Sequence, residues 1–317
     1  MLRKFYFELM PSGLKARYTQ IKNDIIAYKK RITIPNMSGA DMEGLMRSLL
    51  FESPELFFIE LHSIAYGTLG YMMAMEPRYF HLGEETRVTA RLNEAIKEIG
   101  KKRNAYEQVI AIVKWMYRLR YVNNASPDDH TIYGPLMKGE GVCEGFSMVF
   151  MILCLHFGID AMVAFGNIVG ATDAHAWNIV SINGRKYNVD MTSAIAAKKE
   201  YGFDYVDVLV PDYMISNHLS PQSPYCGVLS DNPYYRVGRG FTTLEELKEA
   251  IKTVPATEKE FYLLDCSEEG INVIERFDSL KGAGNIGDIQ SLGRMHHFIR
   301  DSSGPSSLKS LLSKLTR

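Results

Sequence analysis

The sequence predicts an α+β protein in which a central, cysteine-bearing helix packs on an antiparallel sheet, with extensions at both ends of the chain. Two observations carry this prediction. The segment 143–157 is almost entirely apolar and lies between Gly141 and Gly158, which indicates a buried helix. Asn183-Gly184, the dipeptide that a two-residue type I′ turn prefers, joins two β-favouring runs and predicts a hairpin.

Composition and charge restrict the class of protein. The chain has 317 residues, and its 36 basic and 37 acidic side chains leave a net charge of -1, which does not favour a nucleic-acid partner. No run approaches the length of a membrane span, so none is expected. No signal peptide is visible, which predicts a cytoplasmic protein by default, although a chain trimmed of an export signal would have the same sequence features.

The other elements follow from periodicity and turn residues, taken in chain order. Helices are expected at 13–31, 38–51, 84–100 and 104–120, and strands at 31–35, 56–61, 64–80 and 160–165. Residues 123–141 are expected to form a loop, and 174–191 the hairpin. Beyond them we expect a capped helix from 241, a strand, turn and strand over 260–277, a Gly-rich loop over 281–293, and an amphipathic helix marked by Leu308, Leu311, Leu312 and Leu315.

These elements suggest three parts. Residues 1–103 would form a helical and β N-terminal extension, residues 104–240 the catalytic domain, and residues 241–317 a small C-terminal α/β subdomain. At roughly 150 residues per domain, the length agrees with about two domains or with one domain and a large extension.

Cys143 occupies the start of the apolar helix. The positive end of the helix dipole and the unpaired N–H groups there favour a thiolate, which is the nucleophilic form of cysteine. The alternative is a small buried core residue, which is the expectation for Cys154, about three turns further along the helix. With Cys226 and Cys266 there are four cysteines, and their spacing fits neither a zinc site nor a dense disulfide framework.

The hairpin register places a base beside an acid. If Asn183 and Gly184 are the loop, the numbers of cross-strand partners sum to 367, so Trp177 faces Asp190. His175 and Asp190 then become diagonal neighbours on one face, close enough for an imidazole and a carboxylate to meet. Taken alone, His175 could equally be a satisfied strand histidine and Asp190 a cap at the hairpin end.

Three motifs resemble the bacterial transglutaminase-like domain, a branch of the papain-like cysteine hydrolases. They are 133–146, which contains Gly-Val-Cys-Glu-Gly-Phe, then His-Ala-Trp-Asn at 175–178, and Lys-Tyr-Asn-Val-Asp-Met-Thr at 186–192. The resemblance covers about 104–216 and implies the papain-like, transglutaminase-type fold. It departs from the family pattern after Asp190, where Met-Thr-Ser stands in place of Pro-Thr-Trp or a similar run.

The resemblance also implies roles for single residues. Cys143 would be the nucleophile, His175 the general base and then acid, and Asp190 the group that orients the imidazole. The backbone N–H of Cys143 would form half of an oxyanion hole, with Tyr133 as a candidate for the other half. Tyr133 could instead be a loop anchor packed under the helix. Trp177 and Ser193 are candidates for the substrate groove, and Ser193 stands where the family commonly has tryptophan.

No cofactor and no metal are expected. His296 and His297 are adjacent, and adjacent residues of a strand point to opposite faces, so they do not form a metal pair. Asp128, Asp129 and His130 indicate a solvated loop, and no EF-hand-like calcium loop is visible.

The expected activity is acyl transfer to and from Cys143 through a thioester, with hydrolysis of a peptide or amide bond favoured. Its partner would be a peptide or protein substrate. Two alternatives remain open: cross-linking of protein glutamine by an amine acceptor, and a catalytically idle scaffold that binds a peptide or cell-wall component. Hydrolysis is favoured because the tryptophan missing after Asp190 leaves fewer aromatic walls to exclude water.

Overall fold

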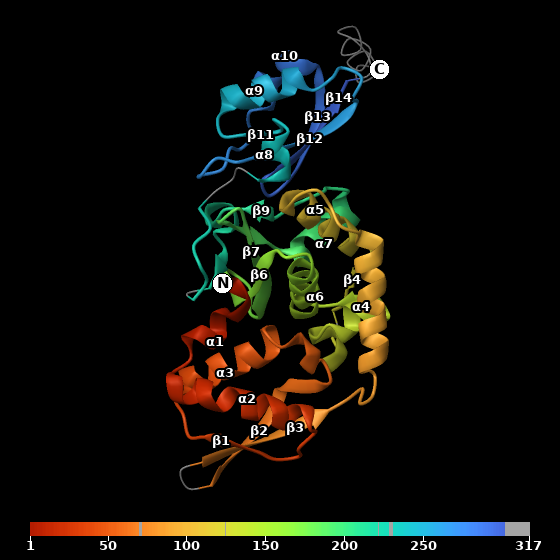
Figure 1. Ribbon diagram of the computed structural model, residues 1–317. Coiled ribbons are helices and arrows are strands. Elements are labelled where there is room, and N and C mark those ends of the chain that lie inside the picture. Colours follow the sequence, from red (N-terminus) through yellow and green to blue (C-terminus); the bar gives the residue numbers. More distant parts are fainter. Residues whose placement is uncertain (70–71, 124, 221, 228–230, 302–317) are drawn as a thin grey trace, which may run out of the picture.

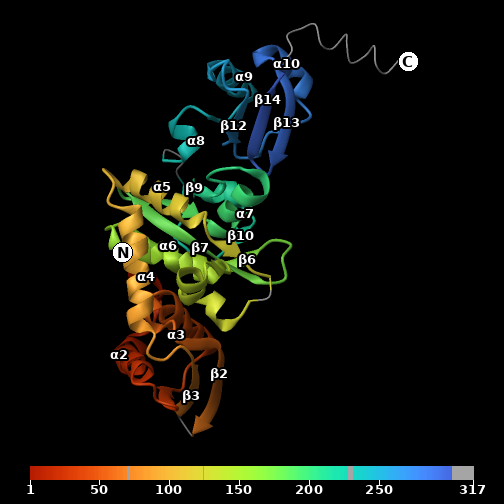
Figure 2. The same ribbon diagram turned by 90° about the vertical axis from the view of Figure 1, so that its right-hand side faces the viewer.

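The computed structural model describes residues 1–69, 72–123, 125–220, 222–227 and 231–301. The side chains of 61–69, 72–73, 282 and 292 are outside this description. Three regions follow one another along the long axis of the molecule, with the N-terminal region at one end and the C-terminal region at the other (Figures 1 and 2). The mixed helices and sheets confirm the α+β class.

The N-terminal region combines helices with a three-stranded antiparallel sheet of order β1-β3-β2. Its elements are η1 (Leu2–Lys4), α1 (Phe5–Leu9), α2 (Ser12–Ile26), β1 (Ile32–Pro35), α3 (Gly39–Phe51), η2 (Pro54–Leu56), β2 (Ile59–Leu69) and β3 (Met72–Tyr79). The helix expected to reach residue 31 ends at Ile26, because Tyr28 adopts a left-handed conformation with φ 55°. The strand expected from residue 56 begins only at Ile59, because Pro54 starts a helical turn before it.

The middle region is built around a five-stranded antiparallel sheet of order β10-β6-β7-β8-β9. Its helical elements are α4 (Glu85–Ile99), α5 (Ala105–Met116), η3 (Pro127–His130), η4 (Gly134–Lys138), α6 (Cys143–His156), α7 (Met191–Tyr201) and η5 (Asp212–Ile215). Its strands are β4 (Arg120–Tyr121), β5 (Glu140–Gly141), β6 (Asp160–Ile168), β7 (Ala174–Ile182), β8 (Arg185–Val189), β9 (Val208–Val210) and β10 (His218–Leu219).

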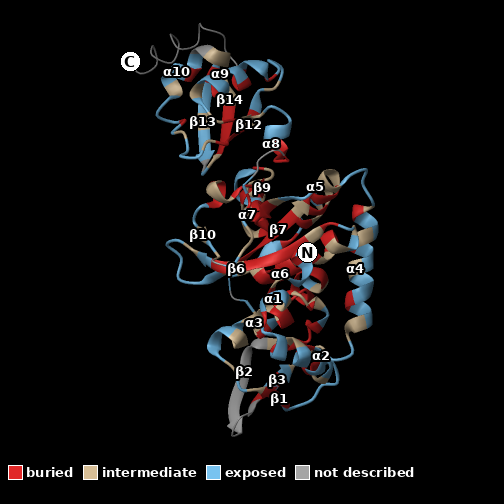
Figure 3. Cartoon of the chain, turned by 60° about the vertical axis from the view of Figure 1, so that its left-hand side comes forward, coloured by how far each residue is buried: buried red, intermediate tan, exposed pale blue. Residues whose placement is uncertain are grey.

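Helix α6 packs against β6 and β7, and buried residues concentrate on these three elements (Figure 3). This arrangement confirms the predicted helix on an antiparallel sheet. The segment 123–141, expected as a loop, instead contains η3, a π-helical turn η4 and the short strand β5, which pairs with β4. Pro127 and Pro135 stand near the starts of the two turns, where a fixed φ and a missing N–H suit a helical first turn.

The hairpin between β7 and β8 has the predicted register. Asn178 pairs with Val189 and Ile182 with Arg185, so partner numbers sum to 367. The second strand ends at Val189 rather than at residue 191, because Asp190 caps the helix α7 that begins at Met191.

The first residues of the chain dock on the central sheet. The backbone N–H groups of Leu2 and Arg3 donate to the Asp160 carboxylate at 2.8 and 3.2 Å. The Tyr6 hydroxyl donates to the carbonyl of Val163 at 3.0 Å, and Tyr6 is buried in the same core as the sheet. The N-terminal region therefore shares a hydrophobic core with the middle region.

The C-terminal region has a four-stranded sheet of order β11-β12-β14-β13 and a hydrophobic core of its own. Its elements are α8 (Pro233–Arg236), β11 (Gly240–Phe241), α9 (Leu244–Thr253), β12 (Glu260–Asp265), α10 (Phe277–Gly284), β13 (Ile286–Leu292) and β14 (Met295–Arg300). The capped helix is confirmed, since the Thr243 hydroxyl accepts from Glu246 N–H. The amphipathic helix expected around Leu308, Leu311, Leu312 and Leu315 lies outside the described residues.

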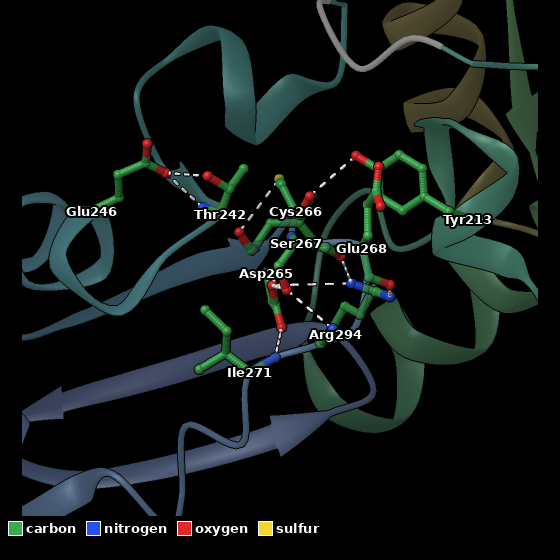
Figure 4. Close-up of polar contacts among 11 residues, drawn as sticks. Tyr213, Thr242, Glu246, Asp265, Cys266, Ser267, Glu268, Ile271 and Arg294 are labelled. Atoms are coloured by element: carbon green, nitrogen blue, oxygen red, sulfur yellow. Dashed lines mark hydrogen bonds and ion pairs between the residues drawn. The ribbon is translucent and has the colours of Figure 1, made fainter.

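Two expectations for the C-terminal region were wrong. Residues 266–277 form no second strand, and 281–293 contain the end of α10 and the strand β13 instead of a loop. Figure 4 shows the reason for the first: the Asp265 carboxylate accepts hydrogen bonds from the backbone N–H groups of Ser267 and Ile271, which closes the chain into a compact loop. The Gly-rich residues 281–293 form regular structure because β13 pairs with β14.

The same loop contacts the middle region. The hydroxyl of Tyr213, from η5, donates to the carbonyl of Cys266 at 3.1 Å (Figure 4). The guanidinium of Arg294 donates to the carbonyls of Ser267 and Glu268 and lies 6.0 Å from the centre of the Tyr213 ring. The C-terminal region is thus joined to the middle region by a bonded contact as well as by the chain.

We expect the C-terminal region to lose stability in acid because of His296. Burial lowers the pKa of His296 to about 4, below its ordinary value of 6.5. As the pH falls, His296 is protonated at a higher pH in the unfolded chain than in the folded protein. The free energy of unfolding is therefore unaffected by His296 above about pH 6.5 and decreases between pH 6.5 and pH 4. The loss should reach about 2 to 3 kcal/mol at pH 4.5. Urea unfolding at pH 7 and at pH 4.5 measures this loss. If a His296→Phe variant lost as much stability between these two pH values as the wild type does, the prediction would be contradicted.

In the part of the chain that the structure describes, no helix has the length and apolar character needed to cross a membrane.

Candidate active site

Cys143 is the first residue of α6, as predicted, and its side chain is only partly buried. The preceding loop holds this end of the helix, since Val142 N–H donates to the carbonyl of Asp129 at 3.1 Å. The first N–H groups of a helix have no carbonyl partner within it, so the backbone N–H of Cys143 is available in principle to a developing oxyanion.

Two glycines around Cys143 let the loop 129–135 lie against the helix start. A Cβ at position 145 would overlap the carbonyl oxygen of Asp129 and lie 2.8 Å from that of Thr131. A Cβ at position 141 would lie 2.9 Å from the Pro135 ring. Gly141 and Gly145 are therefore needed for close approach of backbone to backbone, which explains their places on either side of the cysteine.

Gly145→Ala should destabilise the protein by about 3 kcal/mol, because the methyl group forces the loop carbonyls away from the helix. It should also slow iodoacetamide alkylation of Cys143 by disturbing the helix start. Gly44→Ala in α3 is the matched control, because its Cβ would meet only Met10 at 3.7 Å and alanine favours a helix by about 1 kcal/mol. Equal unfolding midpoints in urea for the two variants would contradict this account.

His175 and Asp190 are in direct contact, as the hairpin register predicted. Nε2 of His175 lies 2.8 Å from Oδ2 of Asp190, and the Asp190 side chain is fully buried. Burial alone would raise the pKa of Asp190, but hydrogen bonds from His175 and His218 hold this pKa well below its usual range. Asp190 is therefore a carboxylate at neutral pH.

Cys143 lies close enough to His175 to influence the pKa of His175. Burial alone would lower the pKa of His175, but the bonds to Asp190 and Cys143 raise it to about 10. With Nε2 directed at Asp190, the imidazole retains Nδ1 for the thiol, and at neutral pH it is a cation. The residues expected to act as nucleophile, base and orienting acid thus lie in the order that a cysteine triad needs.

Asp190 performs a second task as the cap of α7. Its Oδ1 accepts from the backbone N–H groups of Thr192 and Ser193 at 2.8 and 3.2 Å. The Ser193 hydroxyl donates to Oδ2 at 3.0 Å. Both readings that the sequence left open for Asp190, a cap and a partner of His175, therefore hold. The Ser193 side chain is thus hydrogen-bonded to Asp190, and its contact with substrate stays a prediction.

Trp177 lies behind the triad. Its side chain is 2% exposed, its ring is nearly parallel to that of His175 at 6.2 Å between centroids, and Nε1 donates to Asn188 Oδ1 at 3.1 Å. It also lines a cavity of about 660 Å³ together with residues of η5, of β10 and of the segment that follows, including Tyr213, Leu219 and Tyr225. Its role in the substrate groove stays a prediction.

Tyr133 has the surroundings of a loop anchor. Its ring stacks on His81 at 3.7 Å and on Phe57 at 6.1 Å between centroids, and the residue is 8% exposed. Its part in an oxyanion hole stays a prediction.

The sequence analysis did not single out Tyr121. Burial raises the pKa of Tyr121, and the charge of Cys143 adds to this rise, so the two residues lie near each other. It is 43% exposed.

Sequence reasoning missed two residues near Asp190. Nε2 of His218, from β10, lies 3.1 Å from Oδ2 of Asp190. Asp207 lies close enough that burial and the charge of Asp190 raise its pKa to about 6. Among the described residues, His175, Asp190 and His218 form a set whose ligand-type atoms lie within 4.8 Å of one another and could hold a metal ion. Hydrogen bonds already account for both contacts to Asp190, so the chemistry does not require one.

The thiols differ in access, and we expect Cys143 to react first with iodoacetamide at pH 6. Burial raises the pKa of Cys226 and of Cys266 to about 12 and that of Cys154 well above its usual range. These three side chains are at most 2% exposed, whereas Cys143 is partly exposed and near the His175 imidazolium. Peptide mapping by mass spectrometry measures the order, and labelling of Cys226 or Cys266 before Cys143 would contradict it.

Comparison with known proteins adds a domain assignment. Residues 93–191 match the model of a family described as the Transglutaminase-like superfamily, and no curated protein matches the chain. The segment contains α6, the hairpin and all three residues of the Cys143, His175 and Asp190 cluster.

Solved structures also match parts of the chain at low identity. They include a TGase (14% identity, 51% of this chain and 50% of that chain, TM-score 0.31) and the periplasmic domain of TgpA from Pseudomonas aeruginosa (15%, 41% and 57%, TM-score 0.27). Another, from Cytophaga hutchinsonii, is named as a candidate cysteine protease (17%, 50% and 65%, TM-score 0.32). This chain spans half of the first of these proteins and less than two thirds of the others.

Proposed function

We propose, from the match of residues 93–191 to the Transglutaminase-like superfamily, that the protein is a cysteine-dependent acyl-transfer enzyme that hydrolyses a peptide or amide bond. The observation that carries the proposal is the bond of His175 to Asp190, with Cys143 close enough to influence the pKa of the same imidazole. Nucleophile, general acid–base and orienting acid converge at the open end of a helix.

The chemistry follows from the protonation states. The Cys143 thiolate would attack the substrate carbonyl, and the backbone N–H of Cys143 would stabilise the oxyanion. His175, charged at neutral pH, would give its proton to the departing amine, which leaves a thioester on Cys143. The neutral imidazole would then take a proton from water, whose oxygen attacks the thioester, and would return that proton as the thiol leaves.

Asp190 would act through His175 and would not exchange a proton itself. Its low pKa keeps it ionised throughout, so it stabilises the imidazolium and fixes the ring with Nδ1 towards the cysteine. Its bonds to the N–H groups of Thr192 and Ser193 keep the carboxylate from rotating.

Cross-linking of protein glutamine would use the same triad with an amine in place of water. We favour water because the Cys143 side chain is only partly buried and Tyr121, whose charge interacts with that of Cys143, is 43% exposed, so water can approach this end of the helix. The third possibility, an idle scaffold, gains no support from an intact triad with a partly exposed thiol.

A peptide panel offered with and without a labelled primary amine tests the proposal. Mass spectrometry should show peptide cleavage or ammonia release, and a transient adduct of the acyl group on Cys143. Both should be absent in Cys143→Ala. Faster incorporation of the amine than hydrolysis would replace the hydrolase by a transglutaminase. A wild-type protein that binds peptides without forming the adduct would support the scaffold.

A further inference from the structure

We infer that His218 is a positioning residue for the proposed reaction: its imidazole holds the Asp190 carboxylate in the orientation that His175 needs. This inference rests on the proposed function of the triad. Both imidazoles direct Nε2 to the same oxygen, Oδ2 of Asp190, at 2.8 Å from His175 and 3.1 Å from His218. The arrangement extends the triad to a chain of four residues that ends on the strand β10.

Burial makes this contact strong. The side chains of Asp190 and His218 are 0% and 4% exposed, so little water competes for the carboxylate. A hydrogen bond to an ionised group in such surroundings is stronger than in water, and a buried acceptor that loses its donor is costly. Oδ1 is already occupied by Thr192 and Ser193, so His218 acts on the oxygen that faces His175.

A glycine on β6 allows His218 to reach the triad. In the sheet, His218 pairs with Ile168, and His175 pairs with Gly166, two residues away on the same face of β6. A Cβ at position 166 would overlap the carbonyl oxygen of Leu219 and lie 2.8 Å from its carbonyl carbon. Only glycine therefore lets β10 lie close enough to carry His218 to Asp190.

Aromatic contacts then fix the ring of His218. It lies edge-on to Trp177, with centroids 5.0 Å apart at 83°, and edge-on to His175 at 5.5 Å and 68°. Because Trp177 is itself held by the bond of Nε1 to Asn188, the imidazole has a rigid support. A side chain placed only to fill space would not need its nitrogen directed at the carboxylate.

His218 also affects the electrostatic repulsion between two neighbouring acids. Asp190 and Asp207 are neighbouring acids, and the charge of Asp190 contributes to the raised pKa of Asp207, whereas His218 and His175 oppose this rise. The Ser193 hydroxyl donates to Asp190 and also lies near Asp207. Without His218, repulsion between the two acids would favour a turn of the Asp190 carboxylate away from His175.

The test compares His218→Phe, which keeps a ring against Trp177, with His218→Gln, which keeps an N–H donor near the position of Nε2. In His218→Phe we expect kcat for peptide hydrolysis to fall about 10²-fold with KM unchanged, because the base is misoriented in the transition state. His218→Gln should recover most of this loss. Glu200→Ala, an exposed side chain on α7 that lies outside the cavity beside Trp177, is the control that should match the wild type. All assays contain EDTA, so that no metal bound by the two histidines contributes.

The decisive readout is the titration of His175, followed by NMR of ¹⁵N-labelled histidine in the resting protein. The pKa of His175 should fall by at least about one unit in His218→Phe and stay near the wild-type value in His218→Gln. Gly166→Ala should shift it in the same direction by displacing β10.

An unchanged titration in a folded His218→Phe protein would overturn the inference, and so would equal loss of kcat in the Phe and Gln variants, which would indicate a packing role. Because the titration needs no substrate, it remains informative even if no peptide is hydrolysed. The inference and the proposed function can therefore fail separately.

Discussion

Replacing Cys143 by alanine is expected to reduce turnover by about 10⁵- to 10⁶-fold, to the level of the uncatalysed reaction in the assay. The thioester cannot form without the sulfur, whereas the fold should persist, because Cys143 is only partly buried at the edge of the core. The measurement is kcat with the best peptide of the panel, together with a thermal unfolding curve.

Cys154→Ala is the matched control. Cys154 lies on the same helix, is fully buried and serves packing, so its loss should cost stability without lowering kcat by more than a few fold. Residual turnover of Cys143→Ala above one part in about 10³ of the wild type would show that the bond is broken by another group.

Asp190→Asn is expected to lower kcat by about 10³- to 10⁴-fold. The amide keeps an oxygen for the cap of α7, so the fold should survive, but the charge that raises the pKa of His175 is lost. The pKa of His175 should therefore fall, and the alkaline limb of the pH–rate profile, where the imidazolium loses its proton, should move to lower pH. The pH dependence of kcat/KM measures this.

Asp204→Asn serves as the control, because Asp204 is a partly exposed acid paired with Lys198 and should leave the profile unchanged. Asp190→Ala should behave worse than Asp190→Asn, since it also removes the cap of α7, at about 1 kcal/mol. A profile for Asp190→Asn that coincides with that of the wild type would refute the assigned role of Asp190.

Much of the active site was predictable from the sequence because its determinants are local. Gly141 and Gly158 bracket an apolar run, which determined the start of α6 and the position of Cys143. Asn183-Gly184 favours a two-residue turn, and the turn determines the register of the strands that it joins, so the contact of His175 with Asp190 followed from residues close in the chain.

Where local patterns were ambiguous, the predictions were wrong. Residues 266–277 contain apolar side chains that fit a strand, but Asp265 binds the backbone of Ser267 and Ile271 and folds the segment into a loop. The glycines of 281–293 favour a loop in isolation, yet pairing with β14 makes part of this segment a strand.

The sequence by itself determined the class of fold, the position of Cys143 at the helix start and the pairing of His175 with Asp190, since each depends on turn chemistry or periodicity within a few residues. Only the tertiary structure decided that His218 joins them. It lies 28 residues from Asp190 on a strand of two residues, too short to leave a periodic signal. Its approach depends on the absence of a side chain at Gly166, on a third strand. Such a contact is set by the packing of distant segments, and no local preference of the chain specifies it.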